Sequence, residues 1–176
     1  MAFVRVKRIS GSEYAYLVEN SWTERGPRQK VGKYLGKLHR PGKAKSEGLC
    51  AFLGKDAGQH IRGSEFRKVA ADMVKLEMHN HDVKSDDFEV DFDAMTVKKR
   101  GSGRDVVLAM NDGFLCGHTL RQLLEYDAGK DYSGYMLADL ITGAGIMPEQ
   151  DVFIEIYGKF KAKQEAAAAR KFDFYY

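Results

Sequence analysis

The order of the expected secondary structure is the feature that most constrains the fold of this chain. Segments with strand-like alternation and segments with helical spacing occur in separate blocks, whereas a doubly wound α/β protein would alternate them. The pattern predicts an α+β fold: a basic N-terminal antiparallel β-meander, then a mixed body with a second β-meander and a C-terminal helical layer. The expected strands are 3–9, 13–22, 28–38, 88–92, 95–100, 104–110 and 114–116, and the expected helices cover 49–53, 64–79, 119–127, 133–142 and a segment that starts near Pro148. Ser64 and Ser133 are the expected N-caps of two of these helices. Glu89 and Asp91 are expected to point outward from their strand, and Asp112-Gly113 to form the hairpin turn before 114–116.

A polar stretch with a Pro-Gly step, residues 39–46, marks the best internal boundary. We therefore expect a β-meander module at 1–42 and an α+β body at 43–176, which could also form one continuous domain. The hydrophobic fraction of 44% is enough for a real core. No apolar run is long enough for a membrane span, and the start of the chain has no secretory pattern. With two cysteines only, the chain is expected to be a cytoplasmic protein without a membrane partner.

Charge is distributed very unevenly along the chain. The first 45 residues carry eleven Lys or Arg and three acids, whereas the other 131 carry seventeen and twenty-two. The net charge of +3 therefore divides into +8 (11 − 3) and −5 (17 − 22). A basic segment of this kind is typical of a surface that meets a polyanion, most often nucleic acid.

Flat side chains are interleaved with these cations, as expected of a surface that contacts phosphates and bases. Whether they share one face depends on the pairing of the second and third strands, because a one-residue slip reverses every side chain. A two-residue turn at Arg25-Gly26 would set Tyr16 beside Leu35, and a turn one residue longer would place Tyr34 on the face of Tyr16. The candidate nucleic-acid-binding residues are Arg5, Lys7, Arg8, Tyr14, Tyr16, Trp22, Arg25, Arg28, Lys30, Lys33, Tyr34 and Lys37.

Part of this region resembles a known family. Three short runs, Tyr16-Leu17-Val18-Glu19, Gly26-Pro27-Arg28-Gln29-Lys30-Val31 and Tyr34-Leu35-Gly36, are similar to the N-terminal hairpin of insertion-sequence DDE transposases. The resemblance covers about residues 13–37, and no ribonuclease-H-like catalytic domain is recognisable in the rest. It implies a hairpin that contacts DNA or RNA, and it gives no support to strand transfer.

The leading interpretation is a non-catalytic protein that binds RNA or DNA through the phosphate backbone, as an accessory component of a ribonucleoprotein or a DNA-transaction complex. The sequence leaves enzymatic activity open, but it shows no catalytic set, nucleotide-binding loop or cofactor motif. The first alternative is an interaction or oligomerisation module that pairs basic and acidic patches of different chains. The second is a metal-dependent nuclease built on a strip of carboxylates: Asp82, Asp86, Asp87, Glu89, Asp91 and Asp93.

Two further groups of side chains are candidates for binding. A zinc site formed by His79, His81, Cys116 and His118 stays open as a minor alternative, because zinc accepts these ligand types. A protein partner could also bind aromatic side chains near the C-terminus, which are Phe153, Tyr157, Phe160, Phe172, Phe174, Tyr175 and Tyr176.

Overall fold

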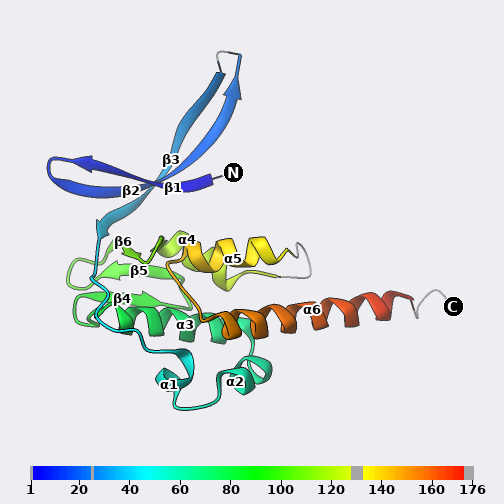
Figure 1. Ribbon diagram of the computed structural model, residues 1–176. Helices are drawn as coiled ribbons and strands as arrows, with labels where there is room; N and C mark the ends of the chain where they lie inside the picture. Colours follow the sequence, from blue (N-terminus) through cyan, green and yellow to red (C-terminus); the bar gives the residue numbers. More distant parts are fainter. Residues whose placement is uncertain (1, 25, 128–132, 173–176) are drawn as a thin grey trace.

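The N-terminal strands form the predicted antiparallel meander. They are β1 (Ala2–Ile9), β2 (Ser12–Thr23) and β3 (Gly26–His39). The computed structural model describes residues 2–24, 26–127 and 133–172, without the side chains of Pro27 and 166–172. The β1–β2 turn uses Ser10 and Gly11, both with positive φ (47° and 78°), which matches the twist of a two-residue hairpin. Figure 1 shows the β1–β2 hairpin and the far end of β2–β3 leaving the body in different directions.

A second meander forms the predicted strand layer of the body. Its members are β4 (Phe88–Asp91), β5 (Thr96–Lys99), β6 (Arg104–Met110) and β7 (Gly113–Leu115), each antiparallel to the next. The α+β class is therefore confirmed.

One strand joins the two meanders, and the sequence did not predict this. β3 pairs parallel with β6, from Lys37 opposite Val106 to His39 opposite Leu108, so the described strands form a seven-stranded sheet. Gly36 permits this approach: it has φ +141°, and a Cβ there would lie 2.6 Å from the backbone oxygen of Asp105. The expected modules 1–42 and 43–176 thus share a sheet, and whether they can fold separately stays a prediction.

The helices cover the body sheet. Ser133 caps α5 as predicted, accepting a hydrogen bond from Met136 N. Two details differ from expectation: α2 was not predicted, and Glu65 instead of Ser64 precedes α3, because the Ser64 hydroxyl pairs with His60. The helices are α1 (Leu49–Leu53), α2 (Ala57–Gly63), α3 (Phe66–Asn80), α4 (Gly117–Leu124), α5 (Gly134–Gly143) and α6 (Gln150–Phe172).

Two hydrophobic clusters hold the molecule together. The larger one lies between the body sheet and the helices and includes Leu108, Val74, Leu120 and Ile156. The smaller one lies between the N-terminal sheet and β6–β7, and its members are Ala15, Leu35, Leu38, Val107 and Cys116. The N-terminal sheet is therefore anchored by buried apolar area at its base, which is the part of β3 nearest β6.

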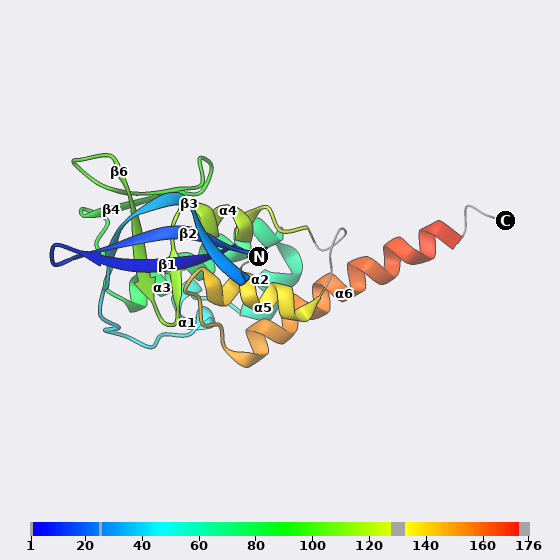
Figure 2. The same ribbon diagram turned by 90° about the horizontal axis from the view of Figure 1, so that it is seen from above.

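The long helix α6 extends well beyond the rest of the body, as seen from above in Figure 2. Among the described helices, none combines the length and the hydropathy that a membrane span requires. Neither cysteine is in a disulfide: Cys50 is exposed and Cys116 is buried at the start of α4.

Candidate nucleic-acid interface

The pairing of β2 with β3 decides which side chains of the N-terminal sheet share a face. Near the turn, Thr23 lies opposite Gly26 and Trp22 opposite Pro27. Two register shifts, between Ala15 and Tyr16 and between Leu17 and Val18, then change the pairing along the strand. Neither of the two uniform registers considered from the sequence is therefore right.

The shifts bring the tyrosines together and leave two cations on the other side. Tyr16 lies opposite Tyr34, and side chains directly opposite each other point the same way. Because β2 alternates regularly, Trp22 is on this face too. Arg28 and Lys30 lie opposite Ser21 and Glu19. These two cations are therefore on the reverse face of the sheet, away from the aromatic residues.

We call the aromatic side of this sheet the open face. It carries cations and exposed apolar groups, and the pairing places no Asp or Glu on it within the described strands. Glu13 and Glu19 point to the reverse face, and Glu24 lies in the turn. The open face consists of Phe3, Arg5, Lys7, Ile9, Ser12, Tyr14, Tyr16, Val18, Asn20, Trp22, Pro27, Gln29, Val31, Tyr34 and Lys37, of which Val18 is fully buried.

The reverse face packs on the body at the base of the sheet. Val4, Val6 and Leu17 contact the smaller hydrophobic cluster there. The remaining candidate cations belong to this side: Arg8 lies opposite Glu13 on the neighbouring strand, and Lys33 lines a small cavity with Arg121. The candidate Arg25 lies outside the described residues.

The rings of the open face form a cluster. The ring centres of Tyr16 and Tyr34 are 5.4 Å apart, and those of Tyr14 and Tyr34 are 6.3 Å apart. Lys7 Nζ lies 5.3 Å from the centre of the Tyr16 ring, a cation–π distance. Partial burial and the neighbouring hydroxyls raise the pKa of Tyr34. The Tyr34 hydroxyl therefore stays uncharged at neutral pH and adds no negative charge to the face.

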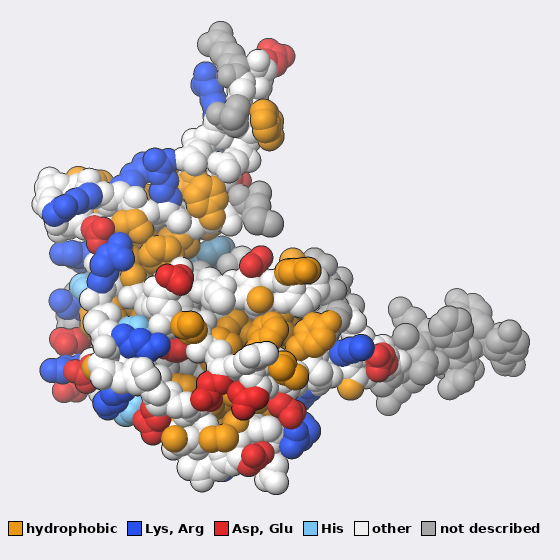
Figure 3. Space-filling view, viewed as in Figure 1, with side chains coloured by type: hydrophobic (Ala, Val, Ile, Leu, Met, Phe, Trp, Pro, Cys, Tyr) orange, Lys and Arg blue, Asp and Glu red, His pale blue; other side chains and the backbone are white. Residues whose placement is uncertain are grey.

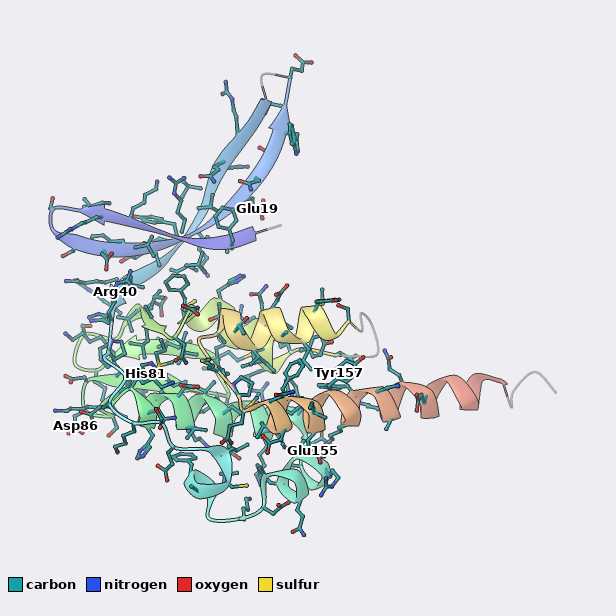
Figure 4. All side chains as sticks on the ribbon, viewed as in Figure 1. Glu19, Arg40, His81, Asp86, Glu155 and Tyr157 are labelled. Carbon is teal, nitrogen blue, oxygen red and sulfur yellow. The ribbon has the colours of Figure 1, made fainter. Side chains whose placement is uncertain are left out.

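The described cations of the open face form no salt bridge with the protein's own carboxylates. Within the described part of β1–β3, no Lys or Arg forms a salt bridge with any acid. Glu13 of β2 does form one, at 2.8 Å, with Arg40, which lies just after β3. The hydrogen bond from Arg40 lowers the pKa of Glu13. Arg40 lies where the chain enters the body, and Glu19 lies near the point where the outer part of the β2–β3 hairpin leaves the body (Figure 4). Figure 3 shows Lys and Arg along this region and Asp and Glu gathered over the helices.

A cavity of about 690 Å³ opens where the tyrosine cluster meets the body. One wall is formed by Tyr14, Tyr34 and Lys37, and the opposite wall by the β5–β6 turn with Lys99 and Arg104. Asp105 is the one carboxylate among the residues that line it. The cavity therefore has an aromatic side and an excess of positive charge, and its volume suits a ligand of small-molecule size.

His39 is one of the residues that line this cavity. Its ring contacts Phe88, with the ring centres 5.0 Å apart, and its Nε2 atom is buried without a hydrogen-bond partner among the described residues. Burial, together with Lys99 and Lys37, lowers the pKa of His39. The imidazole is therefore neutral at physiological pH.

Sequence reasoning missed this second wall. Lys98-Lys99-Arg100 and Arg104 surround a Gly-Ser-Gly turn, so the local charge density was visible. Only the parallel pairing of β3 with β6, which the sequence does not reveal, places this turn beside Tyr34.

The outer part of the β2–β3 hairpin, residues 18–31, projects away from the body, and we call it the arm (Figure 1). Thr23 Oγ1 donates to Gly26 O at 2.9 Å and Ser21 Oγ donates to Arg28 O at 3.3 Å, which supports the hairpin locally. On the open face, the Arg5 guanidinium donates a hydrogen bond to the Gln29 side chain. The Trp22 side chain is 83% exposed near the end of the arm.

The acidic strip is a solvent-exposed strand and turn. Glu89 and Asp91 point outward on β4, as predicted, while Phe88 and Val90 are partly buried. Asp91 Oδ1 accepts hydrogen bonds from the backbone N–H groups of Asp93 and Ala94, which is an ordinary turn-forming role. Among the described residues, no group of three His, Cys, Asp or Glu side chains is placed to hold a metal ion.

The four candidate zinc ligands have separate partners. His79 pairs with Glu47 at 2.8 Å, and buried His81 contacts Glu77 O through Nδ1 at 2.9 Å. Cys116 is the N-cap of α4, and burial, together with the nearby charges of Lys33 and Arg121, lowers the pKa of His118.

The expected exposure of the C-terminal aromatic residues is partly wrong. Phe160 is buried, with its ring centre 4.9 Å from that of Phe66 and 5.5 Å from that of Tyr126, because the first turns of α6 pack on the core. Phe153 is partly buried against the same core. The side chains of the other candidates, Phe172, Phe174, Tyr175 and Tyr176, lie outside the described residues; Tyr157 is half-buried.

Comparisons with known proteins leave the interface to be judged on its geometry. The chain matches no protein-family model, no curated protein and no solved structure.

Proposed function

We propose that this protein binds nucleic acid by holding its phosphate backbone against the open face and the adjoining cavity. The cations that would contact phosphates are Arg5, Lys7 and Lys37 on the sheet and Lys99 and Arg104 across the cavity. No catalytic role is assigned to the protein. RNA and DNA share this backbone chemistry, so both are candidate ligands.

The single observation that carries the proposal is that the acidic side chains of these strands are kept off the open face, although both faces carry cations. The open face has cations and exposed rings but no acid among its described members, while the acids of the same strands point to the other side or lie in the turn. A sheet that served only as a structural layer would have no reason to keep its carboxylates off one face. Unpaired cations with interleaved aromatic rings are what a nucleic-acid surface requires.

The salt dependence of binding tests the proposal. Labelled oligonucleotides of about 20 nucleotides, as RNA and as DNA, would be titrated with protein at several salt concentrations. Five phosphate contacts predict a log–log slope of about −3.5 on single strands, from about −0.7 per contact. Weak binding that is equal at about 50 mM and about 300 mM salt would contradict the proposal.

An interaction module that pairs basic and acidic patches remains the second candidate, because the carboxylates of β4 and its turn are exposed and Asp93 has only a 3.8 Å contact with Arg67. Light scattering without nucleic acid separates the two functions. Self-association that disappears at high salt, in a protein that binds no oligonucleotide, would favour the interaction module.

The similarity of residues 13–37 to the N-terminal hairpin of insertion-sequence DDE transposases agrees with the proposal. A place in a ribonucleoprotein or a DNA-transaction complex, and a cytoplasmic location, stay predictions.

A further inference from the structure

We infer that the open face binds single strands, with unpaired bases stacked on Trp22 and on the tyrosine cluster. This inference rests on the proposed function and adds to it the class of nucleic acid and the role of the arm.

The first line of argument is where the protein exposes its large apolar side chains. In the described part of the chain, the exposed ones on the N-terminal sheet all belong to the open face: Phe3, Ile9, Trp22, Val31 and Tyr34. The others, Tyr135, Met136, Met147 and Ile154, lie on α5, α6 and the loop between them. A face that combines exposed apolar groups with unpaired cations fits a ligand that is both flat and anionic.

The second line concerns the length of this surface. Tyr16 and Trp22 are on one face of the same strand, six residues apart, which corresponds to about 20 Å at about 3.3 Å per residue. Asn20 lies between them on that face and offers an amide for hydrogen bonds. A ligand that reaches both rings must be long and must present several separate flat groups. A polynucleotide strand has this form, whereas a mononucleotide does not.

The third line excludes paired bases as the groups that stack. Inside a duplex each base is already stacked on its neighbours, so its face is not available to a protein ring. Unpaired bases stack on aromatic side chains without sequence preference. The cavity beside Tyr34 has a volume of about 690 Å³, which suits a nucleotide and not a double helix. Lys37, Lys99 and Arg104 would hold the phosphate of the nucleotide that enters it.

The reverse face of the arm offers no equivalent surface. It presents Arg28 and Lys30 beside Glu19, and it carries no aromatic side chain among the residues described there. The ligand is therefore expected to follow the open face alone.

The chain contains one tryptophan, so its fluorescence reports on Trp22 only. The experiment titrates the full chain with oligothymidylate and oligouridylate, with a duplex of the same length, and with polyglutamate as a polyanion that lacks bases. Trp emission is recorded with fluorescence anisotropy of labelled strands. We expect the single strands to quench Trp22 emission strongly and to bind at least about tenfold more tightly than the duplex. A difference of this size corresponds to the contribution of one stacked base or more.

Substitutions then separate stacking from charge. Trp22→Leu should weaken single-strand binding by roughly 5- to 150-fold, the range for one stacked base, and leave the salt slope unchanged. Trp22→Phe should retain most of the affinity. Tyr135→Leu is the matched control, because Tyr135 is 87% exposed but lies on α5 and should have no effect.

Each alternative outcome has a distinct meaning. Equal or tighter binding of the duplex would overturn the single-strand inference and leave the proposed function intact. Single-strand binding that leaves Trp22 emission of the unmodified protein unchanged, or a Trp22→Leu variant that binds single strands normally, would overturn the role of the arm. Polyglutamate that binds as tightly as the single strands would show a surface for acidic proteins. Failure of every oligonucleotide to bind would overturn the proposed function as well.

Discussion

Neutralising cations on one face of the N-terminal sheet and not on the other is the most direct test of the assigned interface. The open-face variant is Arg5→Gln with Lys7→Gln, and the matched reverse-face variant is Arg28→Gln with Lys30→Gln. Each variant removes two positive charges from the same sheet, so the total charge of the protein changes equally. Only the first pair shares a face with Tyr16 and Tyr34.

The expected magnitude follows from the number of contacts. With five cations on single-stranded ligand, raising salt from about 50 to about 300 mM should weaken binding by about 500-fold, from a slope of about −3.5. The open-face variant keeps three cations, so its slope falls to about −2.1 and the same change in salt should cost only about 40-fold. The reverse-face variant should keep the slope of the unmodified protein.

Fluorescence anisotropy with a labelled single strand over this salt range gives the slopes, and thermal melting checks that each variant is folded. None of the four side chains is buried, so melting temperatures should change little. The assignment of the open face is refuted if the reverse-face variant flattens the slope as much as the open-face variant, or if neither changes it.

The remaining predictions concern stability. Gly113→Ala should cost about 3 kcal/mol or more of unfolding free energy, at the upper end of overpacking effects, because a Cβ there would lie 1.9 Å from the backbone oxygen of Thr142. The measurement is urea denaturation, and the control is Gly158→Ala, which lies in open space inside α6 and should be neutral or stabilising. A neutral Gly113→Ala would contradict the packing at this site. His39 and His118 have lowered pKa values, so the unfolded chain takes up protons first on acidification, and the free energy of unfolding should decrease as pH falls below about 6.5 towards their folded-state pKa values. A variant with both histidines changed to Gln should lose less stability between about pH 7.5 and about pH 5.5, and an equal loss would show that other groups govern the response.

Local patterns were enough to predict most elements. Alternation located β1 to β7 within a few residues, and the outward placement of Glu89 and Asp91 followed from the same rule. Ser133 was identified as a cap from its position before an apolar periodic run. These features depend on neighbours in the chain, which is why the sequence reveals them.

The composition of the open face could not be predicted in the same way. Leu35 and Gly32 are the extra residues of β3 at the two register shifts, and each shift moves all later side chains relative to β2. The cavity depends on contacts between residues about 70 positions apart, such as Lys37 with Val106. The role of Gly113 was also different from expectation: Asn111 supplies the left-handed turn conformation, and Gly113 is needed for its close approach to the end of α5.

The shared strand has a consequence for dissecting this protein by truncation. A chain shortened to residues 43–176 would lose the neighbour of β6 along Val106, Val107 and Leu108 and leave backbone N–H and C=O groups there without partners. It would also uncover apolar side chains such as Val107 and Cys116. An exposed edge strand of this kind readily pairs with the same strand of another molecule, so aggregation of the fragment would look like loss of function.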